Sequence, residues 1–418
     1  MKLPSPVQPL ERAPVLDALR GFALLGIFLA NSAAFCGYTF LNPELKAGLF
    51  TYEMDQWLFF TGQALVSGKF YSLFSLLFGI GFSIILLRNQ HKNTNGIKIF
   101  YRRLFILFLF GCFHAFFLWD GDILMLYALL GCLLPLFNKL PNRSLILIWI
   151  FLILSPIAID VFKMFTGWDP GAYLNKLGTE SDKKFGIIAD RGYLYNHNAG
   201  YDEILKWNFS GIYFRWSYLL SSNRLPKVLG MFLLGLYVGR KLIYTKLAEN
   251  KILFQKLCKW GFIIGLPCSI AMAYFENDGR FYYSDPMGLA DTIFYALSVV
   301  PLSLAYASAF CLLWLKDSWN KKLKLFAPAG RMALTNYLMQ SVLGIILYYN
   351  IGFGLGIQFG PAIFFPLAIV IFMLQVGYSR LWLIHFNYGP AEWLWRKLVY
   401  GNSFSMKKQA VELNTITS

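Results

Sequence analysis

His114 is the residue of this sequence best placed to do acid–base or nucleophilic chemistry. It lies in the apolar stretch RRLFILFLFGCFHAFFLWDGDILMLYA and is the only one of four histidines placed well inside such a stretch. Asp120 and Asp122 follow it in an Asp-Gly-Asp turn. A neutral imidazole accepts a proton or an acyl group near neutral pH, and a neighbouring carboxylate fixes its tautomer. The pattern indicates a catalytic histidine oriented by Asp120 or Asp122, or else a packing histidine bonded to a backbone carbonyl.

The first apolar segment, LDALRGFALLGIFLAN, carries three polar residues at helical spacing. Asp17 and Arg20 are three residues apart, and Asn31 follows Arg20 by eleven. Eleven residues close about three helical turns, so the three side chains share one face. They could line a cavity, with Asn31 donating a hydrogen bond to a developing oxyanion. Alternatively, an Asp–Arg pair anchors the inner interface and the asparagine bonds a neighbouring helix.

A second polar group falls near the inner end of a late apolar segment, in APAGRMALTNYLMQS. Asn336 and Gln340 are four residues apart and share a helix face, and Arg331 precedes them. Arg380 lies near the same level in the next segment. Arg331 and Arg380, together with Arg20, predict a basic inner pocket for a phosphorylated ligand. Ordinary snorkelling of these side chains to anionic headgroups is the alternative.

The elements that position these residues must be membrane helices. Of the 418 residues, 57% are hydrophobic and only 14% charged, against about 25% charged in soluble domains. This composition excludes a secreted enzyme, a disordered protein and a soluble nucleotide-binding domain. Because a spanning helix needs about 20 mostly apolar residues, we predict an all-α bundle of about ten transmembrane helices. They are expected near 17–38, 69–88, 102–119, 122–138, 144–165, 225–243, 258–275, 292–314, 333–351 and 362–384.

Loop charges predict the orientation of these helices. Loop 88–103 has five basic residues and no acidic one, and loop 240–259 has six basic residues and one acidic. Loop 276–291, by contrast, has one basic residue and four acidic ones. Because basic residues gather in cytoplasmic loops, both termini are expected in the cytoplasm. The net charge of +16 then reflects those loops rather than nucleic-acid binding, and the chain is expected in a membrane, among lipids.

We predict a single transmembrane domain over residues 1–401 and a disordered cytoplasmic tail over 402–418. The largest outer loop, 166–208, could cap an outer vestibule or rest at the lipid surface. Segments 55–66 and 209–222 are apolar but flanked by polar turns, which is typical of interfacial or re-entrant pieces.

The stretch YGPAEWLWRKLVY, residues 388–400, predicts an amphipathic interfacial helix. Trp393 and Trp395 would then lie at the headgroups, with Arg396 and Lys397 in water.

Glycine and cysteine residues indicate packing rather than ligand binding. Gly79 and Gly81, within an apolar span, permit close approach of a neighbouring helix. The six cysteines form no CxxC pair. Because no His/Cys/carboxylate cluster has ligand spacing, no metal site is predicted.

The chain resembles the YeiB-like family of bacterial inner-membrane proteins, which is catalogued as a domain of unknown function and loosely described as transport-related. The resemblance runs from about residue 12 to 400. It is carried by five motifs in order: LDALRGFALLGIFLAN, GKFYSLFSLLFGIGFS, HAFFLWDGDILMLYA, GRMALTNYLMQS and YGPAEWLWR.

The opening LDxLRG with its apolar helix also resembles the first span of the transmembrane acyltransferase superfamily. That superfamily includes polysaccharide acyltransferases and the lysosomal heparan-glucosaminide N-acetyltransferase. The resemblance implies transfer of an acyl group from cytosolic acyl-CoA to an acceptor across the membrane. In the polysaccharide O-acyltransferases a histidine stands eleven residues after the arginine, where this chain has Asn31. If this chain has a catalytic histidine, that histidine is therefore His114.

Three functions are compatible with these features. The first is an acyltransferase-like enzyme with acyl-CoA as donor and a hydroxyl or amine of a lipid, glycan or small molecule as acceptor. The second is a transporter or flippase of a lipid or small solute. The third is a lipid-binding or sensing protein without catalysis.

Overall fold

The computed structural model describes residues 13–91, 96–187, 193–195, 199–277, 286–401 and 405–408. Their regular structure is helical, with one isolated β-bridge between Phe386 and Lys407. The α-helices are α1 Pro14–Phe35, α2 Pro43–Ala47, α3 Tyr52–Leu65, α4 Lys69–His91, α5 Gly96–Phe117, α6 Leu124–Gly131, α7 Asn142–Thr166, α8 Ala172–Phe185, α9 Tyr201–Ser221, α10 Arg224–Arg240, α11 Lys251–Glu276, α12 Pro286–Trp314, α13 Asp317–Leu323, α14 Ala327–Arg331, α15 Ala333–Tyr348, α16 Pro361–His385 and α17 Pro390–Tyr400.

The prediction of a helical membrane protein is confirmed. Among the described residues, seven helical spans are long and apolar enough to cross a bilayer: α1, α5, α7, α11, α12, α16 and the consecutive pair α3–α4. The other three predicted segments form shorter helices. These are α6 with 8 residues, α10 with 17 and α15 with 16.

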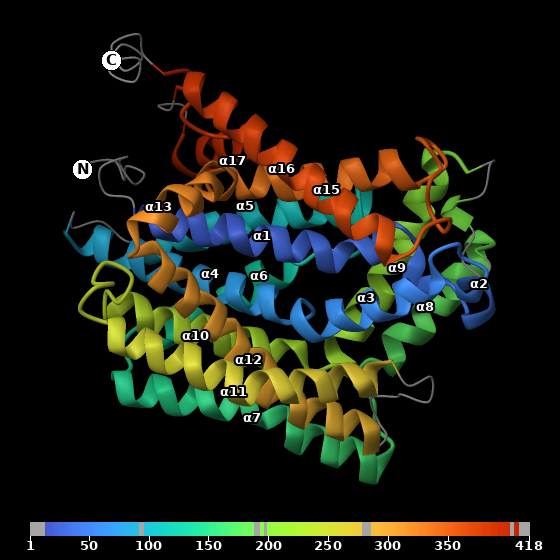
Figure 1. Cartoon of the computed structure of the whole chain (residues 1–418), viewed down its shortest axis with the longest axis horizontal. Coiled ribbons are helices and arrows are strands. Elements are labelled where there is room, and N and C mark those ends of the chain that lie inside the picture. The colour runs from blue at the N-terminus through green and yellow to red at the C-terminus, as the bar shows by residue number, and fades with distance from the viewer. Residues whose placement is uncertain are drawn as a thin grey trace.

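The bundle is elongated along the direction of its helices (Figure 1). α1 runs through its middle and contacts α4, α14, α15 and α16. α7, α10, α11 and α12 pack together on one side of it. Large apolar side chains of α7 and α16, such as Phe151 and Leu374, are about two-thirds exposed at 68% each. Such outward apolar faces suit contact with lipid tails.

α4 and α10 cross closely because both present small residues at the contact. A Cβ atom on Gly79 would lie 2.1 Å from the carbonyl oxygen of Phe232, and one on Gly235 would lie 2.2 Å from that of Leu76. The packing role predicted for Gly79 is therefore confirmed. Gly81 is different: no atom lies within 4 Å of its added Cβ.

Two helix pairs are broken near the same level. α3 and α4 are separated at Gly68, where φ is +83°, a conformation that favours glycine. α9 and α10 are separated at Asn223, where φ is 52°. α4 and α10 both begin at such a break, and their long axes then run side by side (Figure 1).

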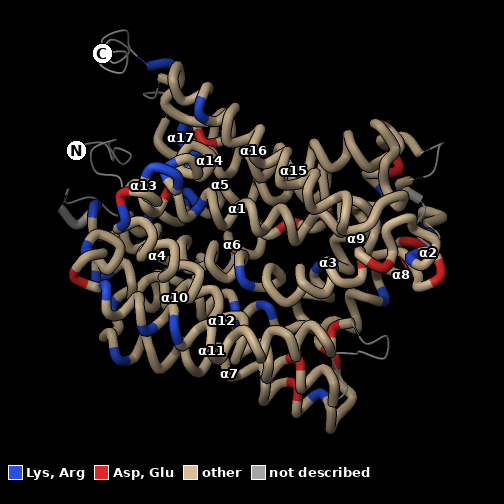
Figure 2. The backbone as a smooth tube through the Cα atoms, viewed as in Figure 1, with Lys and Arg blue, Asp and Glu red and all other residues tan. Residues whose placement is uncertain are grey.

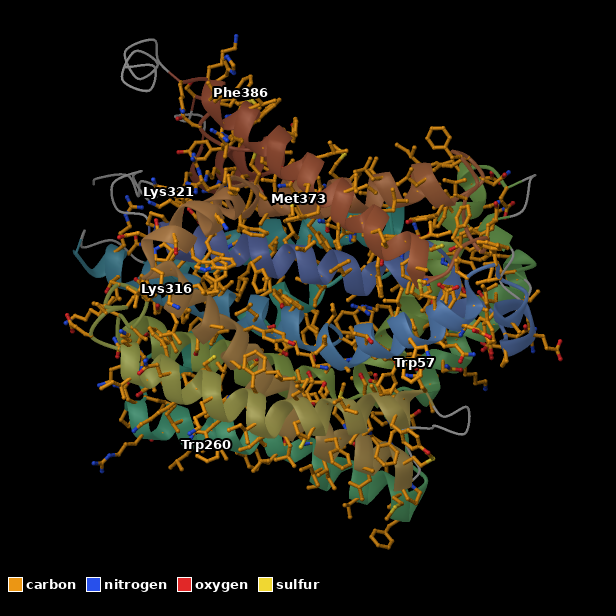
Figure 3. The ribbon with its side chains drawn as sticks, in the orientation of Figure 1. Trp57, Trp260, Lys316, Lys321, Met373 and Phe386 are labelled. Carbon is orange, nitrogen blue, oxygen red and sulfur yellow. The ribbon has the colours of Figure 1, made fainter. Side chains whose placement is uncertain are left out.

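Charge is unevenly distributed between the two ends of the bundle. Lys and Arg gather at the end that holds α13, α14 and α17, whereas acidic residues are frequent at the end that holds α2 and α8 (Figure 2). Lys316 and Lys321 lie at the first of these ends (Figure 3). We call it the basic end and the other the acidic end.

Three peripheral segments differ from the sequence predictions. Much of the predicted loop 166–208 is helical: it contains α8 and the start of α9, and these two helices pack together. Segment 209–222 belongs to the continuous helix α9 rather than to a separate re-entrant piece. Within the predicted tail, residues 405–408 pair with the end of α16, where the Lys408 N–H donates to the carbonyl of His385. The rest of that tail lies outside the described residues.

Candidate functional site

His114 lies near the end of α5 at the centre of a buried chain of hydrogen bonds. Its Nδ1 is 2.9 Å from Oδ2 of Asp122, and its Nε2 is 2.7 Å from Oγ of Ser341 in α15. The exposed fractions of His114, Asp122 and Ser341 are 0%, 4% and 1%. In the neutral tautomer that carries its proton on Nδ1, His114 donates to Asp122 and offers the lone pair of Nε2 to the Ser341 hydroxyl. Carboxylate, imidazole and hydroxyl thus follow in the order that activates a hydroxyl group.

The turn after α5 holds Asp122 rigidly. Its Oδ1 accepts the Met125 N–H at 2.7 Å, and its backbone carbonyl accepts from Nε of Arg215 at 3.2 Å. Gly111, one turn before His114, makes room for this arrangement, because a Cβ there would lie 2.6 Å from the Met125 nitrogen. The backbone therefore positions the carboxylate before any ligand binds.

Asp120, the other predicted partner of His114, points elsewhere. Its carboxylate lies against α9, where a Cβ added to Gly211 would be 2.1 Å from Oδ2. In the structure only Asp122 of the two carboxylates hydrogen-bonds the imidazole.

Tyr337 separates this hydrogen-bonded chain from two cavities. Its ring centroid is 4.8 Å from that of His114. It lines both cavities, as do Ile27 and Ile123. Its buried hydroxyl makes no hydrogen bond of normal geometry to the described residues. The two cavities therefore share a wall beside His114, and we call this wall of Ile27, Ile123 and Tyr337 the junction.

The inner cavity, of about 370 Å³, reaches the basic end, where residues of α14 and α17 line it. Its lining includes five arginines against two carboxylates. They are Arg20, Arg88, Arg103, Arg331 and Arg396, with Asp17 and Glu392. Deeper in, the walls are apolar, with Leu24, Leu104 and Leu107. A lining of arginines beside apolar walls suits an anion with an apolar or uncharged tail.

α17 forms one wall of the inner cavity. Trp395 stacks on the Arg103 guanidinium at 4.4 Å and donates its Nε1–H to the Arg103 carbonyl. Arg396 lies 4.4 Å from the Tyr388 ring centroid. The helix predicted at 388–400 is thus present as α17, Pro390–Tyr400, and its Trp395 and Arg396 line the cavity.

Glu392 ties α17 to the first turn of α15. It accepts from the N–H groups of Leu334 and Thr335 at 2.7 and 3.0 Å, and from the Thr335 hydroxyl at 2.6 Å. Burial raises the pKa of its carboxyl, and these hydrogen bonds act in the opposite direction. The carboxylate caps the helix that carries Tyr337 and Ser341.

The outer cavity, of about 480 Å³, has a mixed lining. Asn31, Arg215, Arg224 and Glu276 contribute polar groups among apolar and aromatic side chains. The Arg224 guanidinium donates to the hydroxyls of Tyr71 and Tyr218. The three polar residues predicted on one face of the first helix are divided between the two cavities. Asn31 lines the outer cavity. Asp17 and Arg20, paired at 2.8 Å, lie at the inner one.

A buried ionic cluster, missed in the sequence, backs the outer cavity. Lys163 of α7 donates to Asp160 at 2.8 Å and to the Ser221 carbonyl at 2.6 Å. Asp160 also accepts from Thr292 at 2.6 Å and from Asn223 at 2.6 Å. These groups secure the α9–α10 break. In the sequence, the sign of this cluster is the pair of charged residues near the end of the α7 segment. Most such residues only anchor a helix at the membrane interface.

The remaining predicted ligand residues line neither cavity. Asn336 donates to the Ser379 hydroxyl at 2.9 Å, and Gln340 donates to Gln375 at 3.1 Å. Both amides therefore join α15 to α16. Arg380 is exposed on α16. Among the described residues, no group of three or more potential metal ligands occurs.

Comparison with known proteins identifies the class. A family model described as "Protein of unknown function (DUF418)" matches residues 238–402. The uncharacterized protein YxaH of Bacillus subtilis is 30% identical over 93% of this chain and 94% of its own length. YeiB of Escherichia coli is 28% identical over 93% of this chain and 96% of its own. An uncharacterized 39.9 kDa protein of Bacillus acidopullulyticus is 27% identical over 96% of this chain and 98% of its own length.

The chain therefore belongs to the YeiB-like family of proteins of unknown function, as its five motifs predict. No solved structure matches it.

Proposed function

We propose that the protein is a membrane acyltransferase. It would take an acyl group from cytosolic acyl-CoA and deliver it to a hydroxyl or amine of a lipid, glycan or small molecule at the outer side. One observation carries this proposal. The arginine-lined inner cavity and the outer cavity share Ile27, Ile123 and Tyr337, and Tyr337 packs against a histidine with a carboxylate partner.

The inner cavity fits the donor. CoA carries several phosphate charges, and arginine is the side chain best suited to bind them. The slim pantetheine arm of CoA would lie along the apolar walls that include Leu24, Leu104 and Leu107. The thioester would then reach the junction at Tyr337.

At the junction His114 acts as general base. Asp122 holds the Nδ1 proton, so Nε2 can take a proton from an attacking hydroxyl or amine. Tyr337 and Asn31, which both line the outer cavity, carry the hydroxyl and amide donors for the developing oxyanion. Because His114 is fully buried, the Tyr337 ring must move before the acceptor reaches it.

This function requires a defined orientation. The basic end lies in the cytoplasm, following the rule for basic residues, and α2 and α8 lie outside. With α6, α10 and α15 counted as crossings, ten helices return both termini to the cytoplasmic side of a bacterial inner membrane.

Ligand stabilisation and thiol release test the proposal on the purified protein. Acetyl-CoA or a long-chain acyl-CoA should raise Tm more than phospholipid does, and free thiol should appear with time. Arg20→Ala should lose the Tm shift, whereas Arg380→Ala, exposed on α16, should keep it. His114→Ala should keep binding and lower the rate of thiol release about a hundredfold or more. Absence of both acyl-CoA binding and thiol release in the unmodified protein would overturn the proposal.

Transport of a lipid or small solute is the second candidate. The breaks at Gly68 and Asn223 favour it, since carriers often build substrate sites from discontinuous helices. It predicts ligand movement across proteoliposomes with no thiol release.

A further inference from the structure

We infer that Ser341 is a covalent nucleophile and that the acyl group passes through a serine ester on α15. The inference rests on the proposed acyl transfer and goes beyond it, because transfer could instead occur directly from donor to acceptor. It assigns chemistry to the last residue of the motif GRMALTNYLMQS, in which only Arg331, Asn336 and Gln340 were predicted to bind a ligand.

The hydroxyl of Ser341 bonds an imidazole, whereas three buried serines of other helices bond only within their own helix. Ser32, Ser83 and Ser303 each donate to a carbonyl of their own helix, at 2.7, 2.7 and 2.8 Å. This internal bonding is the ordinary way for a serine to be satisfied in a membrane helix. The Ser341 hydroxyl instead bonds Nε2 of His114, 227 residues away, at 2.7 Å.

The arrangement around Ser341 gives its hydroxyl a base. When a neutral imidazole donates from Nδ1 to Asp122, its Nε2 accepts the Ser341 proton. Asp122 is itself held by the Met125 N–H. A buried Asp–His–Ser chain held by backbone contacts is the arrangement that activates serine in unrelated acyl-transfer enzymes.

Ser341 also stands beside the path of the donor. Tyr337, one turn earlier on α15, is part of both cavity walls. The residues share a helix face, so rotation of the Tyr337 ring away from His114 brings the cavity junction to the serine hydroxyl.

The reaction then has two balanced halves. Ser341 Oγ attacks the thioester carbonyl while its proton passes to Nε2 of His114. The C–S bond breaks, and the CoA thiolate takes that proton and leaves as the thiol. In the second half an acceptor hydroxyl or amine gives its proton to Nε2 and attacks the serine ester. The C–O bond to Ser341 breaks, and the proton returns to Oγ.

Two measurements on the purified full-length protein test this sequence. The protein is incubated with acetyl-CoA without acceptor, quenched in acid and digested, and the α15 peptide is examined for one added acetyl group. In parallel, exchange of radiolabelled CoA into acetyl-CoA is followed, since a reversible first half-reaction permits exchange without acceptor. The unmodified protein should give the acetylated peptide at Ser341 and show exchange.

Matched variants separate chemistry from folding. Ser341→Ala and His114→Ala should give neither adduct nor exchange, and Ser341→Cys should form a thioester cleaved by neutral hydroxylamine. Ser303→Ala, a buried serine bonded within α12, should retain both signals. Each variant is first checked for an unchanged Tm shift with acetyl-CoA, which reports an intact donor site.

The outcomes also separate this inference from the proposed function. The serine ester is overturned if Ser341→Ala transfers acyl groups to acceptor at an unchanged rate and no serine adduct forms. Direct transfer or a histidine intermediate would then be the route. Lack of acyl-CoA binding and thiol release in the unmodified protein would instead overturn the proposed function itself.

Discussion

The hydrogen bonds of His114 decide which of its nitrogens can move a proton. A histidine alone in an apolar helix usually bonds a backbone carbonyl, and the sequence cannot exclude that arrangement. In the structure both ring nitrogens face side chains, Asp122 and Ser341. Because no carbonyl occupies Nε2, that nitrogen remains able to act as a base.

Replacement of Asp122 by asparagine tests the tautomer argument. The introduced side-chain amide can donate to Nδ1 of His114, which moves the imidazole proton to Nε2 and removes the base. We expect thiol release to fall about a hundredfold or more, with acyl-CoA stabilisation retained. Stopped assays of thiol release against acetyl-CoA concentration measure this change.

Asp120→Asn provides the control, since this carboxylate lies against α9 rather than against His114. It should alter the rate much less than Asp122→Asn. Equal losses in the two variants would show that the difference in geometry does not matter for turnover.

The sequence identified His114 and a pair of carboxylates but not Ser341. The carboxylates lie in the turn that follows the histidine, so local spacing brings them close. Ser341 comes from a helix more than 200 residues later, and one serine in an apolar segment carries no signal of its own. Helical periodicity did indicate a polar face at Asn336 and Gln340, but that face packs on α16.

At the scale of helices, hydrophobic length predicted most spans and failed where polar residues interrupt them. α9 carries Asp202, Glu203, Lys206 and Arg215, so its stretch looked like a polar loop followed by a short apolar piece. α8 is amphipathic and packs on α9, a contact that hydropathy does not show. Gly68, at the α3–α4 break, packs against Val299, whose side chain would lie 2.9 Å from an added Cβ, and the local sequence does not show this contact.

The α4–α10 contact gives a stability prediction. Gly235→Ala places a methyl group 2.2 Å from the Leu76 carbonyl oxygen, so the helices must separate. We expect the free energy of unfolding to fall by about 1–3 kcal/mol, as for other overpacked contacts. Thermal unfolding in a fixed detergent measures the change.

Gly81→Ala is the matched substitution on α4, where nothing lies within 4 Å of the added Cβ. Its Tm should stay close to that of the unmodified protein or rise, because alanine favours helix. A larger loss for Gly81→Ala than for Gly235→Ala would contradict the packing described here.

At the scale of the whole molecule, charge and shape determine how the bundle sits in a membrane. Lys and Arg concentrate at the end that holds α13 and α17 (Figure 2). The inner cavity reaches that end, since residues of α14 and α17 line it. A donor made in the cytoplasm must enter from that side. The proposed function therefore depends on the basic end facing the cytoplasm, which sequence charge counts predict independently.

Cysteine labelling tests this orientation directly. In a variant with the six native cysteines replaced by alanine or serine, one new cysteine is placed at an exposed position of either end. Thr179→Cys lies on α8, and Ala248→Cys lies in the turn between α10 and α11. A membrane-impermeant maleimide should label Thr179→Cys in intact spheroplasts and Ala248→Cys only in inverted vesicles. The reverse pattern would place the arginine-lined cavity outside, where it could not receive cytosolic acyl-CoA. Labelling of both positions from one side would instead exclude an odd number of crossings between α8 and the α10–α11 turn, and with it the ten-helix path.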